Sequence, residues 1–251
     1  MAQPILVINP GSTSTKVAVF EESRRVLEYT VSYSAEALSG FPSIASQYSF
    51  RKLSILSALE ERGFDLSSLA AVVGRGGLLH PIPGGVYRVN QAMKDDLSAA
   101  RYGEHASNLG ALIADDIASS LGIPAFIADP VVVDELSDLA RVSGHALFSR
   151  ISIFHALNQK AVARRYAREQ GKSYESMNLI VAHMGGGVSV GLHKQGRVVD
   201  VNQALSGEGP FSPERSGTLP AGDLVKLCFS GKYSEKEVLR RSEERRVGKE
   251  C

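Results

Sequence analysis

Residues 5–20 read ILVINPGSTSTKVAVF, and residues 178–192 read NLIVAHMGGGVSVGL. Each stretch consists of an apolar run, a loop rich in glycine or hydroxyl residues, and a second apolar run. Short continuous apolar runs bounded by turn residues are typical of buried strands. In both places a turn and a third strand pattern follow, over residues 26–33 and 197–201. The chain therefore contains the same strand–loop–strand–strand unit twice, which indicates an internally duplicated fold.

Two stretches between the repeated units have the periodicity of amphipathic helices. In residues 104–121 apolar side chains recur at helical spacing, Gly122 follows as a stop signal, and Pro124 lies just beyond it. Residues 154–170 show the same kind of pattern and close at Gly171. We therefore predict helices over these two stretches.

Strand-like runs also occur over residues 69–73 and 125–128. Strands that alternate with helices predict an α/β fold. We expect two similar lobes that face each other across a cleft. The first lobe should end near Ala146, and the second should cover residues 147–241.

The end of the chain has a different composition. Residues 242–251 read SEERRVGKEC and are almost devoid of apolar side chains. The second lobe also lacks counterparts of the later strands and helices of the first. We therefore expect a truncated second lobe that ends in an aberrant tail. The alternative is a natural solvated tail on a complete small lobe.

The composition is that of an ordinary globular protein: 251 residues, 43% hydrophobic and 22% charged, with a formal net charge of +1. Such a small net charge creates no global field for nucleic acid or anionic membranes, so neither is expected as a partner. No apolar stretch is long enough to span a membrane and no signal sequence is apparent, so a cytoplasmic location is expected. The two cysteines have no metal-ligand spacing, and Cys228, in an apolar run, is interpreted as a small buried residue.

The two loops have the composition of phosphate-binding loops. Glycine has no Cβ and lets backbone N–H groups approach an anion, successive N–H groups form anion-binding nests, and hydroxyl or ammonium groups add further donors. The candidate phosphate ligands are Asn9, Gly11, Ser12, Ser14 and Lys16 in the first loop, and Gly185, Gly186 and Gly187 in the second. A strand follows each loop, which excludes a Walker A or dinucleotide-binding loop, because both precede a helix.

Five short blocks match the signature blocks of one known family, in the same order. They are NPGSTSTK at 9–16, VGRGG at 73–77, IFH at 153–155, HMGGG at 183–187 and RSGT at 215–218. Through them the chain resembles the acetate kinase family, a branch of the sugar kinase, Hsp70 and actin superfamily. The strings GGVYRVN at 84–90, GEHASN at 103–108 and GEGPFSPERSGTL at 207–219 resemble butyrate kinases in particular. The resemblance extends over residues 5–241.

The resemblance implies duplicated ribonuclease H-like lobes, as in actin-like ATPases. It also implies a short-chain fatty acid kinase that moves a phosphoryl group reversibly between ATP and butyrate, giving butyryl phosphate and ADP, with Mg²⁺ as the metal. Family members continue past residue 242 through a region that completes the adenosine pocket and supplies a late glutamate associated with Mg²⁺, so the metal ligands stay unassigned here. Members tend to form dimers or larger assemblies, which implies a homo-oligomer for the full-length form.

Three residues outside the loops receive roles from the resemblance. Arg75, between glycines at a strand end, would hold the substrate carboxylate, because the planar guanidinium bonds a carboxylate bidentately; the alternative is a solvated loop arginine. Arg215 would stabilise the phosphoryl group in transfer, and its alternative is a salt bridge to a neighbouring acid. Asp129, at the end of a predicted strand, would orient Arg75, Arg215 or the metal shell.

The histidines are divided by position. His183 starts the second glycine loop and would touch the transferring phosphoryl group. His155 either shares that role or caps the helix that follows it. His105 is expected to cap its helix or to be solvated. No functional role is expected for the remaining three, His80, His145 and His193.

The sequence is compatible with several functions. Acetate, propionate or branched-chain fatty acids are alternative substrates, and the acyl chain is expected near Leu78, Pro81, Ile82, Pro83 and Val86. A non-catalytic nucleotide-binding module of the actin or Hsp70 type is a different class of function, although such a module has no need for a pair of arginines that bind a carboxylate and a phosphoryl group. An inactive nucleotide-binding fragment that aggregates through unpaired strand edges is the third possibility.

Overall fold

The computed structural model describes residues 3–205 and 207–243. The chain divides into two compact units, Met1–Val132 and Val133–Cys251. The division falls before the lobe boundary predicted near Ala146, because the segment after Val132 packs into the second unit, where Val133 and Leu136 share a core cluster with Phe154. Of the predicted tail over 242–251, only residues 242 and 243 belong to the described part, and the rest lies outside it.

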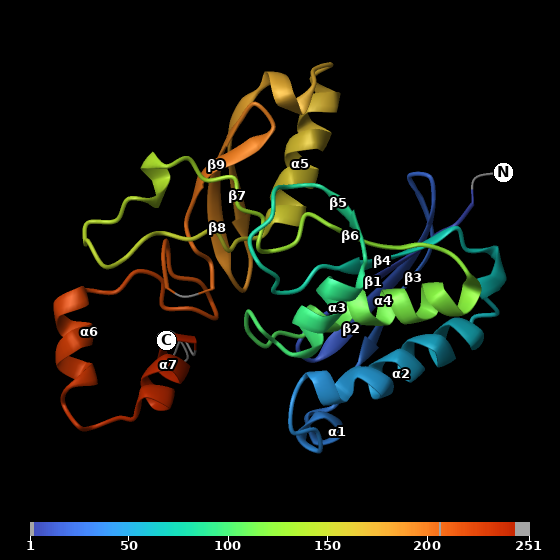
Figure 1. Cartoon of the computed structure of the whole chain (residues 1–251), viewed down its shortest axis with the longest axis horizontal. Helices are drawn as coiled ribbons and strands as arrows, with labels where there is room; N and C mark the ends of the chain where they lie inside the picture. The colour runs from blue at the N-terminus through green and yellow to red at the C-terminus, as the bar shows by residue number, and fades with distance from the viewer. Residues whose placement is uncertain (1–2, 206, 244–251) are drawn as a thin grey trace. The chain divides into compact units, whose positions relative to one another are not determined.

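Six strands form the sheet of the first unit: β1 (Ile5–Pro10), β2 (Ser14–Glu21), β3 (Arg24–Ser32), β4 (Ala71–Arg75), β5 (Val86–Arg88) and β6 (Ala125–Ala128). Their order across the sheet is β3-β2-β1-β4-β6-β5. Strands β1, β4 and β6 run parallel, and the other pairs are antiparallel. This mixed sheet, with helices packed against it (Figure 1), confirms the α/β prediction.

Helices α2 (Tyr48–Glu60) and α4 (Asn108–Leu121) lie side by side against this sheet, with α4 on β1, β4 and β6 and α2 on β2 and β3 (Figure 1). Alternate residues of β1 and β2 point toward these helices and are buried with them. The members of this core that are at most 1% exposed include Leu6, Ile8, Val17, Val19, Ile55, Leu59, Leu109 and Ile113. Each such side chain contributes roughly 1.5–3 kcal/mol of hydrophobic stabilisation.

Helix α4 confirms the prediction at its end and corrects it at its start. It ends at Leu121, and Gly122 adopts a left-handed φ of 70° that favours glycine. It begins only at Asn108, because the residues before it form a turn in which the Ser107 N–H donates to His105 Nδ1 at 3.1 Å. The shorter helices α1 (Ala35–Ser39) and α3 (Gln91–Ser98) complete the unit.

Strand β4 and helix α4 approach each other through two glycines. A β-carbon on Gly74 would lie 2.2 Å from the carbonyl oxygen of Gly110, and one on Gly110 would lie 2.3 Å from the carbonyl oxygen of Arg75. Both obstructing atoms belong to the backbone and cannot rotate away. The strand end that carries Arg75 is therefore held against α4 at a distance that only glycine allows.

We expect Gly110→Ala to lower the free energy of unfolding by about 3 kcal/mol, because the added methyl group forces β4 and α4 apart. Urea denaturation followed by circular dichroism measures the change. Gly40→Ala is the matched control, since a β-carbon there meets nothing within 4 Å and the φ of −74° suits alanine. Equal unfolding midpoints for Gly110→Ala and the unmodified protein would contradict the close approach.

The second unit repeats the opening pattern of the first. Strands β7 (Asn178–Met184), β8 (Val188–Lys194) and β9 (Arg197–Val201) form an antiparallel sheet in the order β7-β8-β9. This is the same meander as β1-β2-β3, so the predicted repeat is confirmed at the level of strand order. Helix α5 (Ala156–Glu169) packs against β7, and Gly171 follows it with a φ of 65°. It starts two residues later than predicted because His155 is its N-cap.

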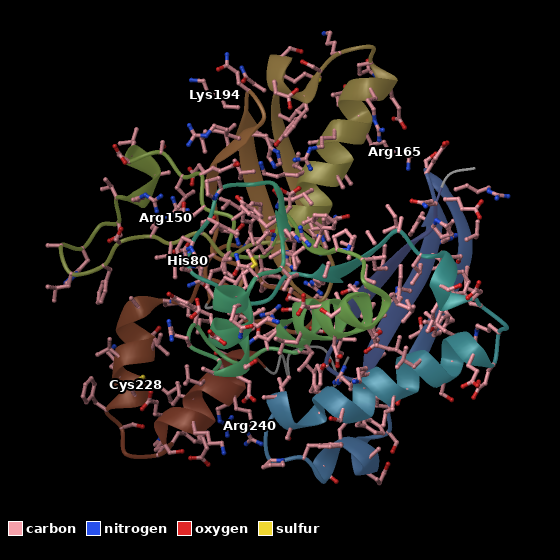
Figure 2. All side chains as sticks on the ribbon, turned by 45° about the vertical axis from the view of Figure 1, so that its right-hand side comes forward. His80, Arg150, Arg165, Lys194, Cys228 and Arg240 are labelled. Carbon is pink, nitrogen blue, oxygen red and sulfur yellow. The ribbon has the colours of Figure 1, made fainter. Side chains whose placement is uncertain are left out.

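Helices α6 (Ala221–Cys228) and α7 (Glu235–Glu243) follow β9 in the chain. The interpretation of Cys228 as a buried residue is wrong, because this thiol is exposed on α6 (Figure 2). Cys228 lines a cavity of about 560 Å³ between α6, α7 and the loop before α6, instead of packing into a core. None of the helices within the described ranges is long and apolar enough to cross a membrane.

Candidate functional site

The parallel strands of the first unit bring three predicted site residues to one edge of the sheet. Asn9 lies near the carboxyl end of β1, Arg75 ends β4, and Asp129 directly follows β6. Since β1, β4 and β6 are adjacent and parallel, these three residues share the edge at which α/β sheets usually bind ligands. The sequence alone placed each residue at a strand end, and the strand order makes them neighbours.

Arg75 is half-buried and has no acidic partner among the described residues. Its Nη1 donates to Asn9 Oδ1 at 3.4 Å, and within the described ranges it forms no ion pair with a carboxylate. Burial lowers the pKa of the Arg75 guanidinium, since the charged form loses hydration. An anionic ligand would offset this loss, and the partial burial of Arg75 differs from what is expected of a solvated loop arginine.

Asp129 is held by backbone groups. It is 4% exposed, its φ is 36°, and its Oδ1 accepts from the Gly85 N–H at 2.8 Å. Its own N–H donates to the Gly85 carbonyl at 2.8 Å. A non-glycine residue at positive φ is a strained feature that often marks functional sites.

The first loop is tied to the body of the unit through its carbonyl groups. The Arg51 guanidinium donates to the carbonyl oxygens of Gly11 and Ser12, both at 2.7 Å. The Thr13 carbonyl accepts from the N–H of Tyr33, the residue after β3, at 2.9 Å. The Ser14 carbonyl accepts from the Gly11 N–H at 2.7 Å. With four successive carbonyls engaged internally, the N–H groups of Ser12 and Thr13 are left without an acceptor among the described residues, so both could donate to an anion.

Arg51 is a positioning residue that sequence reasoning missed. It is 1% exposed, and its other partner is Gln47 Oε1, at 2.8 and 3.0 Å. Its guanidinium also lies over the Tyr33 ring at 4.6 Å, and no carboxylate is among its partners in the described part of the chain. A signal was available: Arg51 shares the buried face of α2 with Ile55 and Leu59 at spacings of four residues.

The glycine loop of the second unit gathers the remaining predicted residues. The rings of His155 and His183 are stacked, with centroids 3.8 Å apart and planes 6° apart. His183 Nδ1 lies 2.9 Å from Asn158 Nδ2, which directs its Nε2 toward the loop. A β-carbon on Gly185 would lie 3.4 Å from His183 Nε2. The N-cap of α5 and the end of β7 thus present two imidazoles to one loop.

The glycines of this loop leave room for charged side chains. A β-carbon on Gly187 would lie 2.5 Å from Arg215 Nη1 and 3.2 Å from His155 Cε1. One on Gly186 would lie 2.6 Å from the carboxylate of Glu214. His155, His183 and Arg215 therefore converge on the loop, and glycine is needed there for space.

Arg215 is set in place by a turn that is anchored to the loop. The buried Ser212 hydroxyl donates to the Gly186 carbonyl. The Ser212 N–H donates to the Arg215 carbonyl at 2.9 Å, and the Arg215 N–H donates to the Ser212 hydroxyl at 3.0 Å. In the described ranges Arg215 forms no ion pair. Among the described residues, the alternative of a salt bridge from Arg215 to a neighbouring acid therefore has no support, although the Glu214 carboxylate adjoins Gly186 of the same loop.

The other histidines are mostly local in their contacts. His105 bonds Ser107 in the turn before α4, His80 lies near Tyr102, and His145 stacks on Phe148. His193 differs, because it is 0% exposed and joins a hydrogen-bond network that reaches His155. Two residues of the predicted acyl region, Leu78 and Ile82, are buried in the core of the first unit, whereas Val86 is 70% exposed.

Within residues 3–205 and 207–243, no three His, Cys, Asp or Glu side chains lie close enough together to hold a metal ion. Apart from the Asp129 carboxylate, the predicted site residues offer mainly donors: guanidinium, imidazole, hydroxyl and backbone N–H groups. Donors of this kind fit the oxygen atoms of a phosphate or carboxylate.

Sequence relatives carry a consistent name. No family model matches the chain. It is 59% identical over 237 residues to butyrate kinase 2 of Clostridium acetobutylicum, and equally to butyrate kinase 1 of that organism, with 94% of this chain and 67% of each relative covered. A probable butyrate kinase of Clostridium botulinum is 58% identical over 238 residues, with 95% of this chain and 67% of the relative covered.

Solved structures support the fold. Acetate kinase from Porphyromonas gingivalis superposes with a TM-score of 0.71 at 17% identity, over 97% of this chain and 68% of that one. A propionate kinase from Francisella tularensis gives 0.67 at 17% identity, over 96% and 68%. At such identities the likeness shows the fold alone, whereas the sequence relatives show the family. The chain therefore belongs to the butyrate kinase family.

Proposed function

We propose that this protein is a short-chain fatty acid kinase that transfers a phosphoryl group reversibly between ATP and butyrate, giving butyryl phosphate and ADP. The observation that carries the proposal is Arg75, a half-buried guanidinium without an acidic partner in the described residues, placed beside Asn9 at the ligand-binding edge of the sheet. Such an arginine calls for a carboxylate ligand. The butyrate kinases to which the chain is similar act, by their names, on a carboxylate of this kind.

The chemistry needs no general base. A fatty acid resembles the Glu side chain, with a reference pKa of about 4.3, and is ionised at pH 7. One carboxylate oxygen attacks the γ-phosphorus of ATP, a new P–O bond forms, and the bond between γ-phosphorus and the β,γ-bridging oxygen breaks. ADP leaves with that electron pair, and no proton has to move. Catalysis then consists of positioning and charge stabilisation, as in other phosphoryl transfers.

Each unit supplies part of this charge stabilisation in our proposal. Arg75 binds the carboxylate, and Asp129 fixes the adjoining loop through Gly85. Arg215, with His183 and His155, donates to the phosphoryl oxygens during transfer. The loop ligands hold the phosphate chain of ATP: Asn9, Gly11, Ser12, Ser14 and Lys16 in the first unit and Gly185, Gly186 and Gly187 in the second. Mg²⁺ enters as part of the MgATP substrate, bound to phosphate oxygens.

We propose that the enzyme prefers one acyl chain length but does not exclude the others. A hydrophobic pocket discriminates by only about 1–3 kcal/mol per methylene group. Butyrate is proposed as the preferred substrate, with acetate, propionate and branched acids turned over less efficiently. Because the reaction uses ATP, we propose a cytoplasmic location.

The test measures acyl phosphate formation from butyrate and MgATP, trapped with hydroxylamine as the hydroxamate, with acetate in parallel. We expect kcat/KM for butyrate to exceed that for acetate. Arg75→Ala should lower kcat/KM for butyrate about 10²–10³-fold, because a charge-assisted bidentate contact is lost. The matched control is Arg88→Ala, an exposed arginine of the same sheet, which should change little.

Two outcomes would contradict the proposal. Full activity of Arg75→Ala would remove the carboxylate-binding role. Tight MgATP binding without any acyl phosphate from a folded sample would favour a non-catalytic nucleotide-binding module instead.

A further inference from the structure

A buried chain of hydrogen bonds leads from the glycine loop into the second unit. His155 Nδ1 lies 2.9 Å from Ser189 Oγ, and Gln159 Nε2 lies 2.8 Å from the same hydroxyl. Gln159 Oε1 lies 2.9 Å from His193 Nε2, and His193 Nδ1 lies 2.6 Å from the Tyr174 hydroxyl. Ser189, Gln159 and His193 are 0% exposed and Tyr174 is 4% exposed. Water therefore cannot replace these partners.

The fold brings this chain together from three elements. Ser189, Gly191 and His193 alternate along β8 and so point to the same side, toward Gln159 on α5. A β-carbon on Gly191 would lie 2.4 Å from Gln159 Oε1, so glycine leaves the space in which the amide lies. Tyr174 closes the far end from the segment after α5.

The orientation of the Gln159 amide is determined by its neighbours. Its Nε2 lies 3.0 Å from the Ser189 carbonyl oxygen, which can only accept, so the amide nitrogen must face Ser189. The amide oxygen must then face His193 and can only accept. His193 Nε2 therefore carries a hydrogen and donates it to Gln159.

His193 is neutral in this setting. Burial, with a smaller contribution from the Lys160 charge, lowers the pKa of His193 to about 4, although Glu135 acts in the opposite direction. Lys160 and Glu135 are themselves paired at 2.9 Å and nearly fully buried. A neutral ring with a hydrogen on Nε2 has a bare Nδ1, which accepts from the Tyr174 hydroxyl.

These contacts determine which atom accepts the hydroxyl hydrogen of Ser189. Its hydroxyl oxygen accepts from Gln159 Nε2 and, at 3.4 Å, from the His155 backbone N–H. Among the described residues the acceptor left within reach of the hydroxyl hydrogen is His155 Nδ1. A His155 ring that accepts at Nδ1 carries its hydrogen on Nε2, the atom that lies 3.4 Å from a β-carbon position on Gly187.

We propose that Gln159, Ser189, His193 and Tyr174 are positioning residues that hold His155 as the neutral tautomer with its hydrogen on Nε2. In that form His155 presents a donor to the glycine loop without placing a positive charge against the stacked His183 ring. The catalytic consequence rests on the proposed function: the ring would donate to a phosphoryl oxygen and would not serve as a base. The tautomer itself does not depend on that function.

The direct test is a long-range ¹H–¹⁵N correlation spectrum at pH 7 of the whole chain labelled with ¹⁵N in its histidine rings. His155→Gln and His193→Gln assign the two signals. We expect both rings to be neutral with the hydrogen on Nε2. A hydrogen on Nδ1 of His155, an equal mixture of tautomers, or a doubly protonated ring would each overturn the proposal. This spectrum needs no turnover, so it separates the proposal from a failure of the kinase assignment.

A variant tests the positioning role. Gln159→Met keeps the volume and removes both amide contacts, so His155 should populate both tautomers and kcat should fall about 10–10²-fold with KM for butyrate unchanged. The control is Gln170→Met at the exposed end of the same helix, which should leave both readouts unchanged. A folded Gln159→Met protein whose His155 tautomer stays fixed would overturn the role. If that variant does not fold, the spectrum of the unmodified protein still decides.

Discussion

Arg215→Ala is expected to lower kcat for butyryl phosphate formation about 10³–10⁵-fold, with a much smaller change in KM for butyrate. An arginine that stabilises the charge of a phosphoryl group in transfer contributes a rate factor of about this size. The structure gives Arg215 the required setting, since its Nη1 adjoins Gly187 and it forms no ion pair in the described ranges. The effect belongs to kcat because the charge is concentrated on the phosphoryl group only in the transition state.

Steady-state hydroxamate assays with varied butyrate and MgATP would separate the two constants. Arg215→Lys should recover part of the loss, because lysine keeps the charge and loses the planar fork. Arg197→Ala, on the exposed side of β9, is the matched control. A rise in KM with kcat intact would show that Arg215 only binds substrate.

Arg51→Met is expected to lower the free energy of unfolding by about 3 kcal/mol or more. The substitution leaves the Gly11 carbonyl, the Ser12 carbonyl and the buried Gln47 Oε1 without their charged donor, and a hydrogen bond to a charged group contributes roughly 1.5–3 kcal/mol. The Arg51 guanidinium binds the carbonyl groups of the first loop, which leaves the loop N–H groups for the phosphates in our proposal. The same substitution should therefore weaken MgATP binding.

Urea denaturation and calorimetric titration with MgATP would measure the two effects. Arg62→Met is a close control, because Arg62 also lies over a tyrosine ring, Tyr29 at 4.4 Å, and also donates to a carbonyl, but is exposed. It should change stability little. Equal losses for the two variants would show that burial of Arg51 is not what matters.

Much of the fold could be read from the order of residues along the chain. Alternating or continuous apolar runs predicted β1, β2, β3, β7, β8 and β9, because strands need a repeat of only two residues to bury one face. The helix that ends at Gly122 was also predictable, since a left-handed stop is a local property. Helix α2 was harder to see because a charged residue, Arg51, occupies its buried face.

For the candidate site, the sequence marked residues but not the contacts between them. The blocks around Arg75, His183 and Arg215 marked those residues from their types and spacing, and the resemblance supplied the roles that we propose. That Arg75 and Arg215 have no acidic partner among the described residues could not be predicted in this way, because it depends on which side chains the fold brings near.

What the chain order determined, then, was local: the repeated strand–loop–strand–strand unit, the glycine loops and the strand ends that carry the charged residues. Only the tertiary structure decided that Arg51 anchors the carbonyls of a loop about forty residues earlier in the chain, that Gly74 meets Gly110, and that Gln159 joins Ser189 to His193. The physical reason is that periodicity reports burial, whereas a hydrogen-bond partner or a steric limit depends on groups that are remote in the sequence and adjacent only after folding.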